Sequence, residues 1–144
     1  MDQTLPLLRE KTRLLYQKIG SVYCPYLSDR VYFSSEGFNH IRYRSARRER
    51  HPQVQYLRYK LLYLAPGLLE MSHTLQEYEK RDSSLSSTQF FGFIGILNQR
   101  KVKVIVKQSG RGNYHFWSII PNWKTRKNAD QKWVQHYSGD LLDD

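Results

Sequence analysis

The chain has 144 residues, the length of one ordinary globular domain, and is too short to bury two independent cores. Hydrophobic residues at 40% exclude a disordered basic tail, and since no apolar run reaches the ~18 residues that cross a bilayer, we expect no membrane partner. The 23 Lys and Arg residues outnumber the 13 Asp and Glu residues, and the formal net charge of +10 favours a polyanion as the ligand.

Targeting and redox signals favour the cytoplasm. The first 18 residues alternate charged with apolar side chains and lack the basic head, apolar stretch and cleavage site of a secretory signal. The single cysteine, Cys24, can form no internal disulfide, and no Cys or His lies at the spacing of a structural zinc site. We expect a small buried side chain there rather than a nucleophile.

Helical spacing of apolar residues characterises the first half of the chain. The period over Thr4–Ile19 predicts an amphipathic helix that ends at Gly20. Residues 21–35 have no sustained period and are expected to form an extended connector with room for a short strand. A second helix is predicted to open at Ser34 or Ser35 and to continue into the arginine cluster that follows.

A third helix and a set of strands complete the chain. The helix begins at Pro52 and ends where Pro66 and Gly67 break the pattern. After Met71 the period changes, and a short strand is predicted at residues 75–78. Three more strands are predicted from a continuous apolar run at residues 90–97, from Lys/Val alternation at 101–108, and from aromatic and β-branched residues at 114–120. Because their connections are short, the predicted class is α+β, with N-terminal helices packed on a four-stranded antiparallel β-sheet. Residues 1–122 then form a single α+β domain, and residues 123–144 a C-terminal peripheral segment or tail.

One face of the predicted sheet carries charge. Lysine alternates with valine in residues 101–108, so the valines are predicted to face the helices and Lys101, Lys103 and Lys107 to face the opposite way.

Positive charge is concentrated in and after the second predicted helix. The cluster has Glu49 as its only acidic residue and contains Arg42, Arg44, Arg47, Arg48, Arg50, Arg58 and Lys60. Such clustering causes self-repulsion unless a ligand neutralises it, so we predict phosphate binding for the cluster as a whole. For any single arginine the alternative is a solvated helix face.

His40 lies within this basic region. On a continuous helix His40, Arg44 and Arg47 would share one face, because they are four and three residues apart. An imidazole can accept a proton from a ribose 2′-hydroxyl or give one to a leaving 5′-oxygen, and guanidinium groups can stabilise charge on the phosphorane. This chemistry requires no metal and no cofactor. The alternative is a histidine that only hydrogen-bonds a backbone carbonyl.

A second candidate segment is the glycine-containing hairpin and strand of residues 107–118. Strand alternation places His115 and Trp117 on one face and Tyr114 and Ser118 on the other, so these groups meet in one pocket only if the strand bulges or twists.

Functional and structural interpretations both remain open for this segment. Ser118 on an apolar face needs a polar partner, which a phosphate oxygen or Gln108 could supply. Trp117 could stack on a base, an interaction worth ~1–3 kcal/mol, or could simply pack in the sheet.

Two classes of hydrolase are excluded. No strained elbow surrounds Ser118, and few carboxylates are available to orient a histidine, which argues against a Ser-His-Asp triad. The same shortage of carboxylates argues against a two-metal nuclease.

Four segments resemble the barnase/colicin D/RelE group of metal-independent ribonucleases (the BECR fold), especially its small phage- and mobile-element-associated toxins. They are Gly37–Ile41 with the arginines that follow, residues 61–69, residues 101–108 and His115–Ser118. The resemblance implies helices before a four-stranded antiparallel sheet, and an endoribonuclease that cleaves RNA by 2′-OH transesterification to a 2′,3′-cyclic phosphate and a 5′-hydroxyl.

Carried over residue by residue, the resemblance implies that His40 is the general acid or base and that Arg44 and Arg47 clamp the phosphate. Ser118 with Gln108 would contact the phosphate or ribose. His115 could either replace His40 as the acid or base or assist it. The residues expected to bind nucleic acid are Arg42, Arg48, Arg50, Lys103, Lys107, Arg111, Tyr114 and Trp117.

One departure from the group's pattern affects this assignment. Colicin D-like enzymes have a lysine just before the histidine, whereas Gly37 and Phe38 stand here. The cation must therefore come from later in the chain or from Lys107.

The expected partners are RNA, either tRNA or mRNA, and an acidic antitoxin or immunity protein of the kind that neutralises such toxins. The main alternative is a non-catalytic basic domain that binds RNA or DNA, because charge and exposed aromatic residues explain affinity without chemistry. A third class is an adaptor whose basic surface meets an acidic protein.

Overall fold

The computed structural model describes residues 4–122 and 141–144. In the described residues the helices are α1 (Thr4–Ile19), α2 (Ser35–Arg42), α3 (Pro52–Leu61) and α4 (Ala65–Glu70), with a 3₁₀ turn, η1, at Leu62–Leu64. The strands are β1 (Ser21–Cys24), β2 (Asp29–Tyr32), β3 (Tyr43–Ser45), β4 (Arg48–Glu49), β5 (Glu77–Asp82), β6 (Ser87–Leu97), β7 (Arg100–Ser109) and β8 (Tyr114–Pro121).

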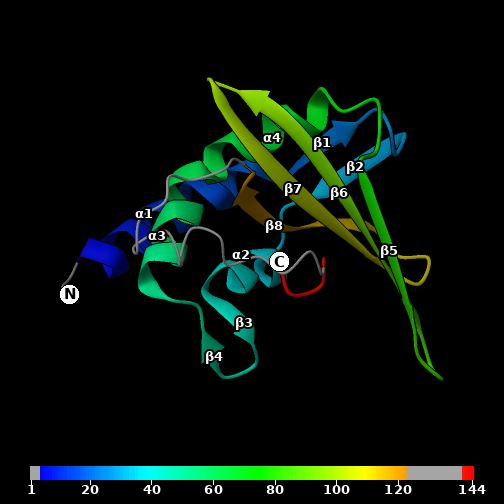
Figure 1. The fold of residues 1–144 in the computed structure, drawn as a ribbon, viewed down its shortest axis with the longest axis horizontal. Coiled ribbons are helices and arrows are strands. Elements are labelled where there is room, and N and C mark those ends of the chain that lie inside the picture. Colours follow the sequence, from blue (N-terminus) through cyan, green and yellow to red (C-terminus); the bar gives the residue numbers. More distant parts are fainter. Residues whose placement is uncertain (1–3, 123–140) are drawn as a thin grey trace.

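These elements form an α+β fold around a six-stranded mixed sheet with the order β1-β2-β8-β7-β6-β5 (Figure 1). The antiparallel meander of β5 to β8 agrees with the strands expected after Met71. The prediction of a four-stranded, wholly antiparallel sheet was wrong, because β1 and β2 form a hairpin that joins the edge of β8. That joint is parallel and pairs only Val31 with Tyr114 and Tyr32 with His115.

Residues 21–35 therefore form more than a connector. Val22 and Cys24 of β1 and Val31 of β2 are buried in the main core, and Ser28 takes the left-handed conformation that the hairpin turn requires (φ 53°). The three buried side chains alternate with exposed ones, which is the period-two pattern of a half-buried strand. Four-residue strands are too short for this pattern to be recognised reliably from sequence.

The second helix is shorter than predicted. It ends at Arg42, and the chain continues as the β3–β4 hairpin. After the hairpin, the Arg50 amide donates a hydrogen bond to the Arg42 carbonyl at 2.8 Å. A continuous helix would have stacked several arginines at spacings of three and four, where like charges repel. The hairpin separates these charges.

The third helix also differs from its prediction near Pro66. The chain tightens into η1 and then resumes as α4, in which Pro66 lies in the first turn. Proline is tolerated there because no intrahelical amide is needed at that position.

Helices cover one face of the sheet and create the main core. Val102, Val104 and Val106 are fully buried beneath them, as the valine–lysine alternation predicted. The opposite face carries a smaller cluster of Phe90, Ile105, Trp117 and Leu141. In Figure 1 the red segment, residues 141–144, lies close to α2 and β8. None of the helices in the described residues is long and apolar enough to cross a membrane.

Candidate functional site

A β-bulge in β8 creates the centre of the candidate site. Ser118 pairs with Ile105 and Phe116 pairs with Val106, so Trp117 is one extra residue in β8. Trp117 packs with Ile105 on the face away from the main core, and the register places Ser118 on the same face. Regular alternation had placed Trp117 and Ser118 on opposite faces; the bulge is the irregularity needed to bring them together.

His40 lies directly against this bulge. Its ring stacks on the Trp117 indole with centroids 3.9 Å apart and planes 19° from parallel. Gly37, one turn earlier in α2, permits this contact, since a Cβ there would lie 2.0 Å from the Phe116 carbonyl oxygen. The chain therefore requires glycine where α2 crosses β8.

Arg50 holds His40 at two points. Its Nε donates to the His40 carbonyl, and its Nη2 contacts the His40 Nε2. Both distances are 2.9 Å. Because a guanidinium has no acceptor, Nε2 must accept, and the proton of the neutral ring is on Nδ1.

The electrostatic surroundings keep the imidazole neutral. Burial, which is the largest cause, and the neighbouring cations Arg50, Arg58 and Lys107 together lower the pKa of His40 to about 2. The Lys107 ammonium lies 4.3 Å from the Trp117 ring centroid and 2.9 Å from a carboxylate oxygen of Glu36. Burial also lowers the pKa of Arg50, to about 10.

A second group of buried polar side chains surrounds Ser118. Arg58 reaches it from α3, and its Nη1 donates to the Ser118 Oγ at 2.9 Å. Both residues and Lys103 are almost fully buried. The Lys103 ammonium is 2.9 Å from Glu77 and 3.5 Å from the Asp144 carboxylate.

The arginines expected to clamp a phosphate beside His40 lie elsewhere. The predicted helical row of His40, Arg44 and Arg47 was wrong, because α2 ends at Arg42. Arg44, Arg47 and Arg48 are exposed on the β3–β4 hairpin, where Arg44 lies 3.7 Å from Asp143. Arg42 pairs with Glu49 at 3.3 Å.

The remaining predicted residues lie near the far end of β7 and β8. The Gln108 side-chain amide accepts a hydrogen bond from Gln89 and donates one to the Gly112 carbonyl. These partners differ from the polar groups around Ser118. His115 lies beside Tyr32, with ring centroids 6.3 Å apart, and its buried Nδ1 has no hydrogen-bond partner within residues 4–122 and 141–144. Two more residues are placed apart from His40: Tyr114 packs against Phe91, and Arg111 is exposed in the turn.

Arg58 belongs to the charged cluster predicted from the sequence but not to the predicted site. A signal for it was present, because Val54, Arg58 and Leu61 lie at spacings of four and three on the buried stripe of α3. An arginine on such a stripe must be paired or hydrogen-bonded.

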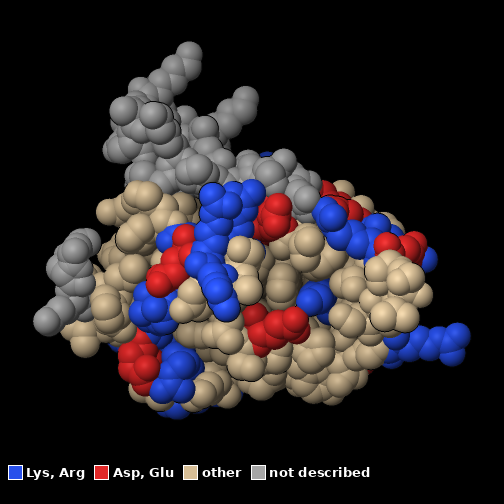
Figure 2. Space-filling view, turned by 90° about the horizontal axis from the view of Figure 1, so that it is seen from below, with Lys and Arg blue, Asp and Glu red and all other residues tan. Residues whose placement is uncertain are grey.

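Acidic and basic side chains are interspersed on the face of the molecule that Figure 2 shows. Asp and Glu lie among the Lys and Arg side chains there, so this face is not an unbroken basic surface. Among the described residues no group of His, Cys, Asp and Glu could hold a metal ion.

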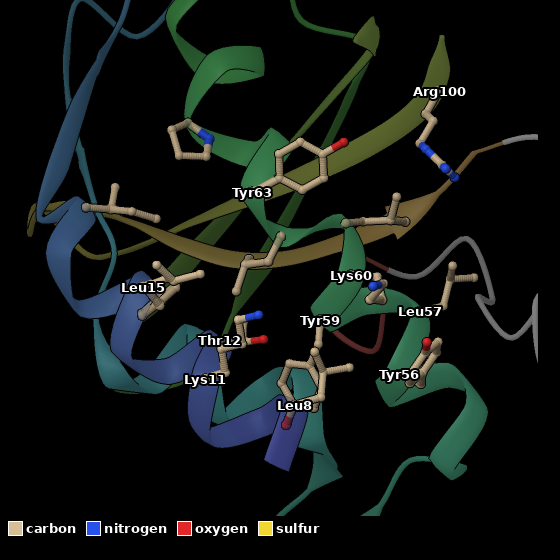
Figure 3. A pocket seen from close by; sticks show the side chains of 15 residues that line it. Leu8, Lys11, Thr12, Leu15, Tyr56, Leu57, Tyr59, Lys60, Tyr63 and Arg100 are labelled. Atoms are coloured by element: carbon tan, nitrogen blue, oxygen red, sulfur yellow. The ribbon is translucent and has the colours of Figure 1, made fainter. Parts of the chain in front are cut away.

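A separate hollow of about 750 Å³ lies between α1 and α3 (Figure 3). Leu8, Leu15, Tyr56 and Tyr63 are among its lining residues, and the His40 and Ser118 groups are not. It is therefore a different place from the candidate site.

Comparison of the chain with protein-family models, with curated protein sequences and with solved structures gives no match. Function must therefore be inferred from the site itself. It combines a neutral imidazole, two buried guanidiniums, a buried lysine, a hydroxyl and an indole, which are the groups that bind an anion and move a proton.

Proposed function

We propose that the protein is a metal-independent endoribonuclease of the barnase/colicin D/RelE type. The observation that supports this proposal is the convergence of His40, Arg50, Arg58 and Ser118 on the bulge at Trp117. They come from α2, from the residue after β4, from α3 and from β8, and all four side chains are buried. A bound phosphate would offset the cations that help to lower the pKa of His40, which would make its imidazole a stronger base for an attacking ribose hydroxyl, and the same cations would stabilise the charge on phosphorus.

In the proposed reaction His40 takes the proton from the 2′-hydroxyl, whose oxygen then bonds to phosphorus as the bond to the 5′-oxygen breaks. The same proton ends on the 5′-oxygen, so no further reactant is consumed and the products are a 2′,3′-cyclic phosphate and a 5′-hydroxyl. A bound phosphate draws the Arg50 guanidinium toward itself and frees Nε2 of His40. Trp117 orients the ring of His40 by stacking on it. On this face of the indole, the His40 ring lies where the sequence led us to expect a nucleic-acid base.

The RNA is proposed to be tRNA or mRNA, and an acidic antitoxin or immunity protein is the proposed inhibitor. The exposed arginines of the β3–β4 hairpin are suited to contact the phosphates of a longer RNA.

A non-catalytic domain that binds RNA or DNA is the second candidate, and one observation favours it. The His40 ring is only 6% exposed and already accepts a hydrogen bond from Arg50, which is also the arrangement of a structural histidine. The exposed arginines would then supply the affinity.

An RNA cleavage assay in excess EDTA separates the two candidates. We expect the wild type and a His73→Ala control, which changes an exposed histidine, to cleave total RNA, and His40→Ala to be slower by roughly 10²-fold or more. Cyclic-phosphate ends should be found on the products. Mobility shifts without cleavage in all three proteins would support the binding domain, and cleavage that EDTA abolishes would contradict the proposed mechanism.

A further inference from the structure

Residues 141–144 lie across the candidate site and contact most of its groups. The Leu142 carbonyl accepts from the Trp117 indole at 3.0 Å, and the Asp143 carbonyl accepts from Arg50 at 2.8 Å. The main-chain oxygen of Asp144 accepts from both Ser118, at 2.7 Å, and Arg58.

Apolar contact fixes the same segment. Leu141 is 2% exposed and packs with Phe90, Ile105 and Trp117, while its amide donates to Glu79 at 2.9 Å. The segment thus presents an apolar group to an aromatic surface and, three residues later, oxygen atoms to buried cations. An RNA nucleotide presents its base and its phosphate in the same way.

The pocket around Arg58 has the properties of an anion site. Arg58 is 1% exposed, and its Nε is buried without a hydrogen-bond partner among the described residues. Burial and the neighbouring Arg50 lower the pKa of Arg58, and Asp144 is the acidic group that opposes this effect. Lys103 is paired with Glu77 and also lies 3.5 Å from the Asp144 carboxylate, so Asp144 supplies compensating charge to both buried cations. A guanidinium with this much burial and an unused donor is suited to a phosphate oxygen.

We infer that Arg58, Lys103 and Ser118 form a phosphate subsite for RNA, and that Leu141–Asp144 occupy it as a built-in competitor. This inference rests on the proposed function for the identity of the ligand, RNA, but not for the cleavage step. The chain is then self-inhibited in the state described, and RNA must displace the segment in order to bind.

The first test removes the charges of the segment without changing its shape. Asp143→Asn/Asp144→Asn is compared with Glu70→Gln/Asp82→Asn, which alters net charge equally at exposed residues on α4 and β5. The probe is a fluorescent single-stranded RNA with 2′-O-methyl groups, which cannot be cleaved through the 2′-hydroxyl. If the segment fills the site in about nine molecules of ten, loss of the competitor tightens apparent binding roughly tenfold, whereas the control pair should change it far less.

The second test leaves net charge unchanged. Leu141→Ala weakens only the apolar attachment of the segment, and Ile96→Ala, at an exposed position on β6, is its control. We expect tighter binding for Leu141→Ala alone. The inference stands only if both segment variants bind the probe more tightly than their controls, and equal affinities in either comparison would overturn it.

The two proposals can fail separately. Tighter binding by the segment variants with no cleavage by any variant would support the competitor and reject the nuclease. Cleavage that depends on His40, with no change of affinity in the segment variants, would support the nuclease and reject the competitor.

Discussion

At the scale of single residues, the neutral state of His40 links the site to stability. An unfolded histidine takes up a proton near pH 6.5, whereas burial and the neighbouring cations lower the pKa of His40 to about 2 in the folded chain. Between these values the unfolded chain binds more protons. The contribution of His40 is therefore complete above pH 6.5 and is lost as the pH falls toward 2.

Replacement of His40 by phenylalanine should remove this dependence while keeping a ring on Trp117. We expect the free energy of unfolding of the wild type to fall by about 1.4 kcal/mol per pH unit below pH 6.5 relative to His40→Phe. Urea unfolding between pH 7.5 and 5 measures this difference. His73→Gln, at an exposed position, should follow the wild type, and parallel curves for His40→Phe and the wild type would contradict the buried neutral ring.

At the scale of secondary structure elements, the close approach of α2 to β8 positions His40. Gly37→Ala should force the two elements apart, because the new Cβ would meet the Phe116 carbonyl, which cannot move without the strand. We expect a loss of about 1–3 kcal/mol of stability, with loss of the His40 function even where the protein stays folded.

Gly67→Ala is the matched control in α4, since its Cβ would meet only the end of the Leu97 side chain at 3.0 Å. Chemical denaturation of both variants measures the difference. Equal stabilities would show that the α2–β8 contact does not depend on glycine.

The elements also explain how far the sequence could be interpreted. The long strands β6 to β8 and the helix α1 were predictable because each has a strong local signal and a turn or glycine at its end. The signal is one sustained period in α1 and β7, a continuous apolar run in β6, and aromatic and β-branched residues in β8. The end of α2 at Arg42 was not, since it depends on repulsion among arginines and on a hydrogen bond to Arg50. The β1–β2 hairpin joins β8 through contacts between distant residues, which no local period encodes.

The site was also predictable only in part, because local sequence signals do not encode contacts between distant residues. His40, Trp117 and Ser118 were singled out as residue types suited to the chemistry, and the need for a bulge followed from strand alternation. Of the cations that meet them, Arg58 had a signal in the apolar stripe of α3, whereas Arg50 was indistinguishable by sequence from the exposed arginines around it. For Arg50, tertiary packing selects which guanidinium is buried.

At the scale of the whole molecule, the excess of positive charge predicts salt-dependent binding. Arg47 and Arg48 are exposed on the β3–β4 hairpin, outside the buried site. If each contacts one phosphate of single-stranded RNA, Arg47→Gln/Arg48→Gln should make the slope of log affinity against log salt shallower by about 1.4.

Fluorescence anisotropy with an RNA oligonucleotide over a range of KCl concentrations measures these slopes. Lys18→Gln/Lys80→Gln removes the same charge from exposed positions on α1 and β5 and should leave the slope nearly unchanged. Identical slopes for the two double variants would show that the hairpin does not contact RNA.

The short parallel joint between β2 and β8 has a consequence for how the chain folds. Its paired residues lie about eighty positions apart, and only Tyr114 and His115 of β8 gain a strand neighbour on that side. Closing so long a loop for so few hydrogen bonds is slow compared with forming the meander. During refolding β8 would remain an open edge, so high protein concentration should favour aggregation at that stage, before the first hairpin docks.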